Sequence, residues 1–557
     1  MVVHAFDNCA TKCGSTLQFS RHPKRIWQRE FLTTFSVPGP SMAIDRPGWT
    51  WPERRHFRLC LAASAFLFLV CSVFSAGSHD PDEYFQNVEF ASAKLSITDK
   101  ADLPWEYRAE MRPWLQPAIY VGVARAAGYL GVQRPLTLLF LFRLVTAIFA
   151  WSSLWTLVVA GRRWIDGEAE RRRLYSIAAF LWLLPFLGVR TSGETMATSA
   201  LCFGIALLEW RTNLLTGRGS FVFAVLAGIA FGLCFDFRYT SGVMAAGAGL
   251  WYLRPAKKRL SLFVGLALGA LLALALGVLA DWWGYGRITF PVYSYLYQNF
   301  VLGRSRDFGT APFFAYLYLP LLEAGAMAPL VLALLVATLV AWLARVRSVL
   351  TWTTAPYVAL LCIVGHKEAR FLFPLAPFLP FFVVIALASE PLLGARLASF
   401  LRWLTSGYRF KLGYLLNVCG LLGVILLPQG ANYPLYALIE NESFAADGPL
   451  EVVVVAVPNN NKLPYRYVGL HMAFLEPKNL RWTLDTSVTE LEAKHSRGET
   501  FLALVDIPVR FSEPTAWIRS RCAFVWSTWP RWLQPYDFFG WEERSHWWEF
   551  YRCDAGQ

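Results

Sequence analysis

The hydrophobic positions of the chain form long apolar segments, which short polar segments separate between residues 59 and 428. A helix needs ~20 apolar residues to cross the hydrocarbon of a bilayer, and shorter segments suffice where neighbouring helices shield a broken one. The pattern therefore predicts an α-helical polytopic bundle with about eleven membrane-spanning segments. They are residues 59–76, 135–160, 174–189, 196–209, 220–235, 240–253, 261–280, 321–343, 348–364, 371–388 and 412–428.

Clusters of Arg and Lys occur in alternate loops of this predicted bundle. They include "GRRWIDGEAERRR" at residues 161–173, "RPAKKR" at 254–259 and "RWLTSGYRFK" at 402–411, which alternation of the spans places on one face. Such an excess of positive charge is typical of cytoplasmic loops. The sequence therefore predicts which face is cytoplasmic, by a route independent of segment length.

The loop that follows the first segment, residues 77–134, contains an apolar stretch of its own at residues 114–131. Counting this stretch as a span would break the alternation of basic loops. Trp105, Tyr107 and Trp114 have the amphipathic character of residues at a membrane interface. We therefore interpret the stretch as a re-entrant or interfacial helix, while an extra span with one later span lost remains the alternative.

The other face collects the polar residues that are suited to chemistry. It receives "SHDPDEYFQ" at residues 78–86, "RTSGET" at 190–195, the loop 281–319, "GHKEARF" at 365–371 and the tail beyond 428. Each of these segments alone is typical of a solvated loop or of a helix end with extended charged side chains. Their common face, however, indicates a functional site at the mouth of the bundle.

The composition agrees with a membrane protein. Hydrophobic residues make up 55% of the 557 residues and charged residues 16%, whereas roughly a quarter of a soluble domain is charged. The formal net charge of +13 comes from short basic clusters between apolar segments. Because these clusters form no continuous basic face, we expect no nucleic-acid partner, and the lipid bilayer is the expected environment.

The two ends of the chain differ from the bundle, residues 56–428, and from each other. Residues 1–55 are basic and irregular, and Met42 opens a segment with the plan of a signal anchor. Residues 429–557 predict a small mixed α/β domain outside the membrane, because "EVVVVAVP" and "TFLALVDIPV" have the pattern of short buried strands. Cys522 and Cys553 lie in that domain, and whether they pair stays open.

A carboxylate at the mouth of a bundle, with cationic side chains on the same face, suits transfer of a sugar from a lipid-phosphate donor. The acceptor hydroxyl needs a general base, and the leaving phosphate needs cationic or hydrogen-bonding groups. One carboxylate suffices for a single inversion at the sugar carbon. The sequence shows neither the Gly-rich phosphate loop nor the metal-binding acidic pair that a nucleotide-sugar enzyme would favour, so we expect no cofactor and no metal.

Four motifs carry a resemblance to a known family. "PDEYFQNVEFA", "RTSGETMATSA", "DWWGYGRITFPVYSYLYQNFVLGRSRDFGTAPF" and "GHKEARFLFPLAPF" occur in that order between residues 59 and 400. The chain thereby resembles the dolichyl-phosphate-mannose-dependent mannosyltransferases of glycosyltransferase family 22, which serve GPI-anchor and N-glycan synthesis. The resemblance implies a GT-C type fold, a lumenal active site and inversion of the anomeric centre without a required metal.

The resemblance also implies roles for individual residues. The acidic pair of the first loop falls on Asp82, the preferred base, and Glu83, the alternative base, while Asp80 stands where the family usually has a histidine. Residues that match the His-Lys-Glu-x-Arg motif are expected to face the donor phosphate: His366, Lys367 and Arg370. Residues expected to shape the acceptor site are Asp281, Tyr285, Asn299, Gly309 and Thr310, with Arg190 and Glu194 as weaker matches.

The predicted partners are a polyprenyl-phosphate sugar donor and a glycan or glycolipid acceptor. Because no motif reads the hydroxyl pattern of the sugar, a transferase of the same fold that uses another polyprenyl-phosphate sugar stays an alternative. A lipid or sugar transporter is less favoured, because we find none of the internal repeats that such folds show. The expected location is the endoplasmic reticulum membrane in a eukaryote or the plasma membrane in a bacterium.

Overall fold

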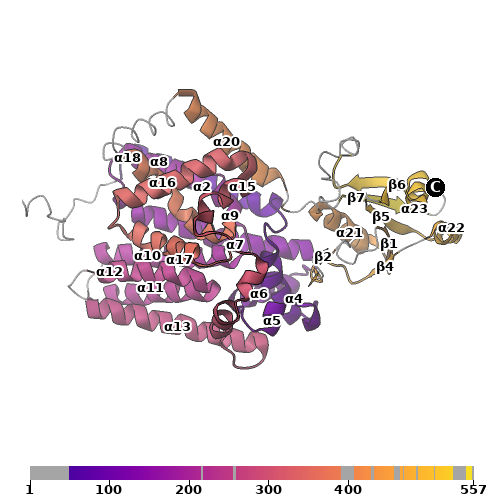
Figure 1. The fold of residues 1–557 in the computed structure, drawn as a ribbon, viewed down its shortest axis with the longest axis horizontal. Coiled ribbons are helices and arrows are strands. Elements are labelled where there is room, and N and C mark those ends of the chain that lie inside the picture. The colour runs from indigo at the N-terminus through magenta and orange to yellow at the C-terminus, as the bar shows by residue number, and fades with distance from the viewer. Residues whose placement is uncertain are drawn as a thin grey trace, which may run out of the picture. The chain divides into compact units, whose positions relative to one another are not determined.

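The computed structural model describes most of the chain from Trp49 onward. Residues 1–48, with the predicted N-terminal segment and Met42, lie outside the described residues. The described ranges are 49–214, 217–254, 259–389, 407–427, 429, 432–456, 465–467, 470–484, 487–506, 509–530 and 547–554. Within residues 50–557, which form one unit, helices come first along the chain and a small sheet follows (Figure 1).

Every apolar segment that was predicted to span is helical in the structure. The segment 174–189 divides into two helices at Leu181, and the segment 371–388 begins as a 3₁₀ helix, η9 (Ala369–Phe378), before α18. The helices are α2 (Trp51–Phe74), α7 (Pro135–Gly161), α8 (Glu168–Phe180), α9 (Leu183–Gly188), α10 (Gly193–Leu214), α11 (Gly217–Phe237), α12 (Gly242–Leu253), α13 (Arg259–Tyr285), α15 (Leu319–Ala324), α16 (Ala328–Ala344), α17 (Val349–Ile363), α18 (Leu379–Ala388) and α20 (Gly407–Leu426).

Length and composition mark six helical segments of the described residues as able to cross a membrane on their own. They are Trp51–Phe74, Pro135–Trp164, Gly219–Phe237, Leu260–Tyr285, Phe313–Ala344 and Ala369–Ala388. The helical nature of the predicted segments is therefore confirmed, while the count of about eleven spans stays a prediction. The chain is an integral membrane protein by these helices.

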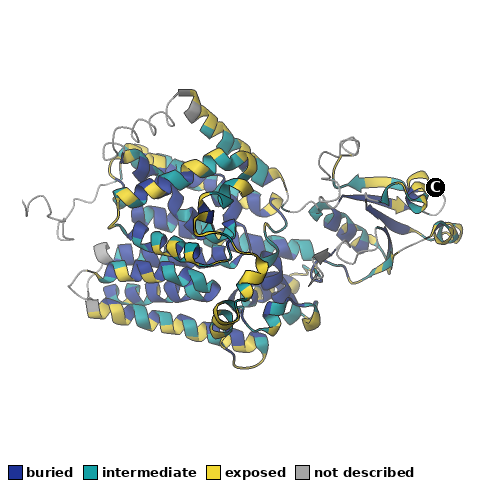
Figure 2. Ribbon diagram, viewed as in Figure 1, coloured by how far each residue is buried: buried dark blue, intermediate teal, exposed yellow. Residues whose placement is uncertain are grey.

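Apolar side chains cover the outer faces of several helices. Figure 2 shows exposed residues along α13, where Leu260, Phe263 and Leu271 are among the large side chains left uncovered. Its inner face packs on α11, which in turn packs on α10 (Figure 1). An exposed apolar face of this length is expected where lipid rather than water surrounds a helix.

Contacts between loops support the predicted division into two faces. Glu53, near the start of α2, is fully buried and accepts hydrogen bonds from Arg162 at 2.8 Å and Arg171 at 3.0 Å. The indole of Trp251 donates to the carbonyl of Arg347 at 2.7 Å. The first contact joins the start of α2 to the basic residues 161–173, and the second joins the end of α12, next to the basic residues 254–259, to Arg347.

The first loop folds into short helices rather than a single element. After α2 the chain forms α3 (Pro81–Glu83), a π-helical turn η1 (Tyr84–Val88) and α4 (Glu89–Lys94). α5 (Trp105–Arg108) and α6 (Leu115–Tyr129) follow. The predicted helix at 114–131 is thus present as α6, and its relation to a membrane surface stays a prediction.

The C-terminal residues form the small mixed α/β domain that the sequence predicted. Its five-stranded sheet has the order β4-β1-β5-β7-β6, with β1 parallel to both neighbours and β7 antiparallel to both of its own. Cys522 and Cys553 form a disulfide beside β7. The elements are α21 (Tyr433–Ala445), β1 (Leu450–Val455), β2 (Arg466–Tyr467), β3 (Leu470–His471), β4 (Leu480–Leu484), α22 (Val488–Ser496), β5 (Phe501–Asp506), α23 (Glu513–Arg521), β6 (Ala523–Ser527) and β7 (Trp548–Cys553).

Candidate active site

The turn that leaves α2 is fixed by a buried arginine. Arg190, which is 1% exposed, donates hydrogen bonds to the carbonyl of Gly77 at 3.1 Å and to the hydroxyl of Ser75 at 2.9 Å. Gly77 has a φ of +88°, a conformation that favours glycine. The start of the acidic loop is therefore held against the segment between α9 and α10.

The next residues separate the two candidate bases. Asp80 caps α3, because its side chain accepts a hydrogen bond from the backbone N–H of Asp82 at 2.8 Å. Glu83 is 4% exposed and accepts a hydrogen bond from the backbone N–H of His79 at 3.1 Å. Asp82 has a side chain that is 32% exposed. Asp82 is thus more accessible than Glu83.

Arg370 joins the acidic loop to the His-Lys-Glu-x-Arg motif. Its three kinds of N–H group each donate to a different carboxylate: Nη2 to Asp82 at 2.6 Å, Nη1 to Asp80 and Nε to Glu368. His366 contacts Glu368 at 2.7 Å through Nε2 and the carbonyl of Gly309 at 3.0 Å through Nδ1. Three segments far apart in the chain therefore meet in one polar network.

The network gives the carboxylates different pKa values. Burial disfavours the charged form of Asp82, but the guanidinium groups of Arg370 and Arg112 outweigh burial and lower its pKa. Burial raises the pKa of Asp80 to about 6 and that of Glu83 to about 7, because their cationic neighbours compensate only in part. Asp82 is therefore ionised at neutral pH, while Glu83 keeps its proton to a higher pH than Asp82 does.

A pocket opens beside this network, which we call the carboxylate pocket. Oδ2 of Asp82 accepts a hydrogen bond from Arg370. Among the described residues, the other oxygen of Asp82 accepts no hydrogen bond. The lining residues of the carboxylate pocket are Asp80, Asp82, Glu83, Gln86, Asn87, Ser192, Gly193, Glu194, Arg370 and Phe373. A hydroxyl group that enters this pocket meets an ionised carboxylate with a free lone pair.

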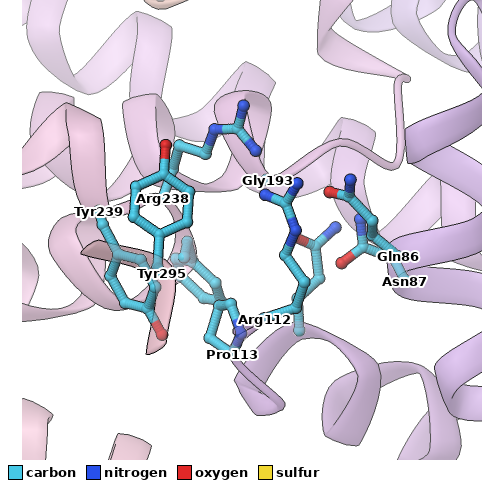
Figure 3. A pocket seen from close by; sticks show the side chains of 10 residues that line it. Gln86, Asn87, Arg112, Pro113, Gly193, Arg238, Tyr239 and Tyr295 are labelled. Carbon is cyan, nitrogen blue, oxygen red and sulfur yellow. The ribbon is translucent and has the colours of Figure 1, made fainter. Parts of the chain in front are cut away.

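A second pocket adjoins the first, which we call the arginine pocket. Figure 3 shows Arg112 in its middle, with Gln86 and Asn87 on one side and Tyr239 and Tyr295 on the other. Its lining residues are Gln86, Asn87, Arg112, Pro113, Gln116, Gly193, Phe237, Arg238, Tyr239 and Tyr295. The two pockets share Gln86, Asn87 and Gly193, and they are therefore parts of one continuous site.

Some of the residues predicted from the sequence stabilise the segments that carry this site. Asp281 accepts a hydrogen bond from the backbone N–H of Trp114 at 2.8 Å, and the hydroxyl of Tyr285 donates to the carbonyl of Arg112 at 2.8 Å. Glu194 lines the carboxylate pocket and forms an ion pair with Arg238 at 3.0 Å. Asp281 and Tyr285 thus hold the backbone around Arg112, and neither lines the two pockets.

Other predicted residues lie outside both pockets. Lys367 is 8% exposed, and its ammonium group donates to the carbonyl of Val364 at its own turn. Asn299 donates to the carbonyl of Tyr295 at 2.9 Å. Thr310 is exposed and follows Gly309, whose carbonyl contacts His366. The structure therefore does not bring Lys367, Asn299 or Thr310 to the lining of the site.

Several lining residues were not predicted from the sequence. Gln86 and Asn87 follow Asp82 and Glu83 by four residues each, a spacing of one helical turn that would have placed them beside the acidic pair. Arg112 carries no comparable signal, because it comes from a different part of the first loop. Among the described residues, no cluster of three or more His, Cys, Asp or Glu side chains is arranged to hold a metal ion.

The chain matches known proteins over its helical part. A GPI mannosyltransferase 3 from Yarrowia lipolytica is 27% identical over 316 residues, which are 56% of this chain and 58% of that protein. The proteins of the same name from Candida albicans and Drosophila melanogaster are each 25% identical and match over 62% and 55% of their lengths. The chain therefore matches little more than half the length of these relatives, and their shared name belongs to the mannosyltransferases of GPI-anchor synthesis that the motifs resemble.

Solved structures resemble this fold more distantly. ArnT from Cupriavidus metallidurans in the apo state is 12% identical, with a TM-score of 0.46 over 90% of this chain and 98% of that chain. The Archaeoglobus fulgidus oligosaccharyltransferase is 14% identical, with a TM-score of 0.45 over 84% and 71% of the two chains.

The predicted polytopic helical bundle with a small mixed α/β domain agrees with the observed elements. The resemblance that the four motifs carry is confirmed by a family model, which matches residues 61–427 and thus well over half of the chain. The match includes the acidic loop, Arg190, the loop after α13 and the His-Lys-Glu-x-Arg motif. The chain belongs to the Alg9-like mannosyltransferase family.

Proposed function

We propose that the protein is an inverting mannosyltransferase. It transfers mannose from a polyprenyl (dolichyl) phosphate donor to a hydroxyl of a glycan or glycolipid on the lumenal or extracytoplasmic side of the membrane. The observation that carries the proposal is the ionised Asp82, whose free oxygen borders a pocket at the end of α2. The family and the names of its relatives support mannose as the sugar.

The proposed reaction needs one proton transfer and one displacement. The acceptor hydroxyl enters the carboxylate pocket and gives its proton to Asp82 while its oxygen attacks C1 of the sugar. The bond between C1 and the phosphate oxygen breaks, and its electron pair leaves with polyprenyl phosphate. Attack opposite the leaving group inverts the configuration at C1, as a single displacement requires.

Glu83 is the alternative base, but its surroundings suit the role less well. A base must be deprotonated and must reach the hydroxyl. Burial raises the pKa of Glu83 to about 7, and its side chain already accepts the backbone N–H of His79. Asp82 meets both conditions, since it is ionised and more accessible.

Arg370 and His366 both contact other groups of the chain within the polar network. Each of the three nitrogen atoms of Arg370 donates to a carboxylate, and His366 contacts Glu368 and the carbonyl of Gly309. We infer that Arg370 positions Asp82 and keeps it ionised. Direct contact of His366, Lys367 or Arg370 with the donor phosphate stays a prediction.

A transfer assay with the purified full-length chain in lipid nanodiscs tests the proposed function. The donors are polyprenyl-phosphate mannose and polyprenyl-phosphate glucose, and the acceptors are mannose-terminated glycolipids. We expect transfer of mannose, and we expect Asp82→Asn to lower turnover by about 10²- to 10⁴-fold, the usual cost of losing a positioned base. Asp166→Asn, at a side chain that is 92% exposed, is the matched control and should keep parental turnover.

Three outcomes would change the proposal. Transfer of glucose in preference to mannose would favour the alternative donor sugar. Parental turnover of Asp82→Asn together with an inactive Glu83→Gln would move the base to Glu83. Movement of the labelled lipid across the membrane of sealed proteoliposomes without any transfer would favour a transporter.

A further inference from the structure

The two adjoining pockets differ in charge. The carboxylate pocket contains four acidic side chains and one arginine, whereas the lining of the arginine pocket contains Arg112 and Arg238 and no carboxylate. Such a division suits a reaction in which a proton is accepted at one end and an anion leaves at the other. The position of the leaving anion can therefore be sought among the arginines.

Arg112 differs from the other two arginines in its free hydrogen-bonding capacity. Arg370 donates to three carboxylates, and Arg238 forms an ion pair with Glu194 at 3.0 Å. The nearest carboxylate oxygen to Arg112 among the described residues belongs to Glu106, at 3.4 Å, and Nε of Arg112 is buried without a hydrogen-bond partner. An unmade hydrogen bond on a buried guanidinium is costly, so this group is suited to an anionic ligand.

The backbone that carries Arg112 is held in place before any ligand arrives. Tyr285 donates to the carbonyl of Arg112, and Asp281 accepts the N–H of Trp114, which is 1% exposed. The side chain of Arg112 is only 14% exposed. A guanidinium fixed on such a backbone loses little entropy when it binds a phosphate.

Gln116 provides an independent sign of a ligand. It is 2% exposed, lines the arginine pocket and donates from Nε2 to the carbonyl of Thr191 at 2.8 Å, which fixes the orientation of its amide. Its Oε1 atom is buried without a hydrogen-bond partner among the described residues. A sugar hydroxyl would supply the missing donor, and a phosphate would not, because it offers no donor when ionised.

We propose that the arginine pocket binds the sugar-phosphate of the donor, with Arg112 on the phosphate and Gln116 on a sugar hydroxyl. The inference rests on the proposed function for the identity of the donor. It places the sugar beside Gln86 and Asn87, which both pockets share, and thus between the phosphate and Asp82. The acceptor then approaches from the side opposite to the leaving group, as inversion requires.

Binding measurements separate this inference from activity. The probe is a short-chain polyprenyl phosphate without sugar, titrated against the full-length chain in nanodiscs. We expect Arg112→Gln to weaken binding roughly 10- to 100-fold, the equivalent of a charged hydrogen bond lost, and Arg112→Lys to recover part of the loss. Arg108→Gln, at an exposed arginine of the same loop, should bind as the parent does.

Gln116→Met gives a second test that does not alter the charge. It should weaken binding of polyprenyl-phosphate mannose roughly tenfold, since one buried acceptor is lost, and leave binding of the sugar-free phosphate unchanged. Thermal unfolding of each variant in detergent identifies substitutions that fail to fold. An equal loss of affinity for polyprenyl-phosphate mannose and for the sugar-free phosphate, in a Gln116→Met variant that folds, would overturn the assignment of Gln116.

Other outcomes decide between sites and between ligands. Parental binding by Arg112→Gln, with loss in Arg370→Lys, would return the phosphate to Arg370 and overturn the inference. Equal competition by phosphatidylinositol would show a general lipid-phosphate site and would also overturn it. Arg112-dependent binding without mannose transfer would leave the phosphate site standing and refute the proposed function, whereas transfer independent of Arg112 would refute the inference alone.

Discussion

Arg370 determines how the charge of the acidic loop is distributed. Burial alone would raise the pKa of Asp82, and the guanidinium of Arg370 at 2.6 Å is the largest of the effects that reverse this. Replacing Arg370 by Gln should therefore raise the pKa of Asp82. Because the proposed base works only when ionised, the acid limb of the turnover–pH profile should move to higher pH.

The full pH dependence of turnover, measured for the parent, Arg370→Gln and Arg370→Lys, checks this prediction. Lys keeps a charge but has no planar fork to reach three carboxylates, so its acid limb should lie between those of the other two proteins. An acid limb at the same pH in all three would show that Arg370 does not control Asp82. A change in donor KM with an unchanged acid limb would instead support the phosphate contact predicted from the motif.

At the scale of single residues, sequence motifs indicated several residues that line the site. Residues that belong to no motif, and that only the fold brings to the site, were missed. Asp82, Glu83, Glu194 and Arg370 line one pocket, although 288 residues separate Asp82 from Arg370. Arg112 was missed because no motif marks it in the sequence. It becomes distinctive only when α13 supplies Tyr285 and the folded loops supply two adjoining pockets.

The turn between α2 and the acidic loop has almost no room for a larger residue. A Cβ atom on Gly77 would lie 1.6 Å from the carbonyl oxygen of Gln429, and the φ of Gly77 is +88°. Gly77→Ala must therefore separate the two backbones and disturb the hydrogen bond from Arg190. Strain of this kind costs about 1–3 kcal/mol, and the acidic loop should lose its position.

We expect Gly77→Ala to lower both the thermal stability of the detergent-solubilised protein and its turnover. Gly122→Ala on α6 is the matched control, because a Cβ there meets no atom within 4 Å and alanine favours a helix. Equal stability and turnover in the two variants would show that the turn tolerates movement.

The contact between the first loop and the C-terminal domain depends on a buried glutamate. Glu89 is 1% exposed, lies beside Tyr84 and His471, and accepts hydrogen bonds from the hydroxyl of Thr98 and, at 3.2 Å, from the backbone N–H of Phe474. Burial raises its pKa to about 7, despite these bonds. A raised carboxyl pKa favours the folded form when protonated, so this stabilisation is lost as the pH rises through about 7.

Hydrogen exchange of the Phe474 segment should therefore become faster between about pH 6 and about pH 8, after correction for the intrinsic rate, by an amount on the order of 1–2 kcal/mol. Glu89→Gln cannot ionise and should remove this dependence. His471 lies beside Glu89, so His471→Gln is the control that should keep the pH dependence. The same corrected pH dependence in Glu89→Gln as in the parent would contradict the assignment.

Helices and strands were predictable where burial leaves a recognisable apolar pattern in the sequence. The apolar helices were found because lipid surrounds the bundle. The central strands β1 and β5 were found because they are buried within the sheet. The break at Leu181 between α8 and α9 was not found, because both halves are apolar. The short helices of the first loop depend on contacts with distant segments, such as Arg370 with Asp80.

The whole molecule has two chemically different faces, and contacts in the structure join the loops of each face in pairs. Glu53 meets Arg171 on the basic face, and Asp82 meets Arg370 on the face that carries the site. Under the proposed function the donor has a lipid tail, which would confine its phosphate to the depth of the membrane boundary. A site at the exit of α2 would meet that depth, which accounts for carboxylates that follow directly on an apolar helix.

Single cysteines and a membrane-impermeant maleimide on sealed vesicles test which face is which. The background protein lacks Cys362 and Cys419, which are not buried, and Cys9 and Cys13 of the N-terminal segment. Ser78→Cys and Thr310→Cys report the site face. Asp166→Cys reports the basic face and is preferable to its neighbour Gly167, whose φ of +82° would strain a larger residue.

We expect Asp166→Cys to be labelled only from the cytoplasmic side and the other two only from the lumenal or periplasmic side. The reason is electrostatic, because loops rich in Arg and Lys are retained on the cytoplasmic side during insertion. Labelling of Asp166→Cys and Ser78→Cys from the same side would require an even number of spans between them and would remove the two-face arrangement. Labelling of Asp166→Cys from the lumenal or periplasmic side and of Ser78→Cys from the cytoplasmic side would keep the bundle but place donor and acceptor in the cytoplasm. This outcome would leave the chemistry of Asp82 intact and would overturn its proposed location.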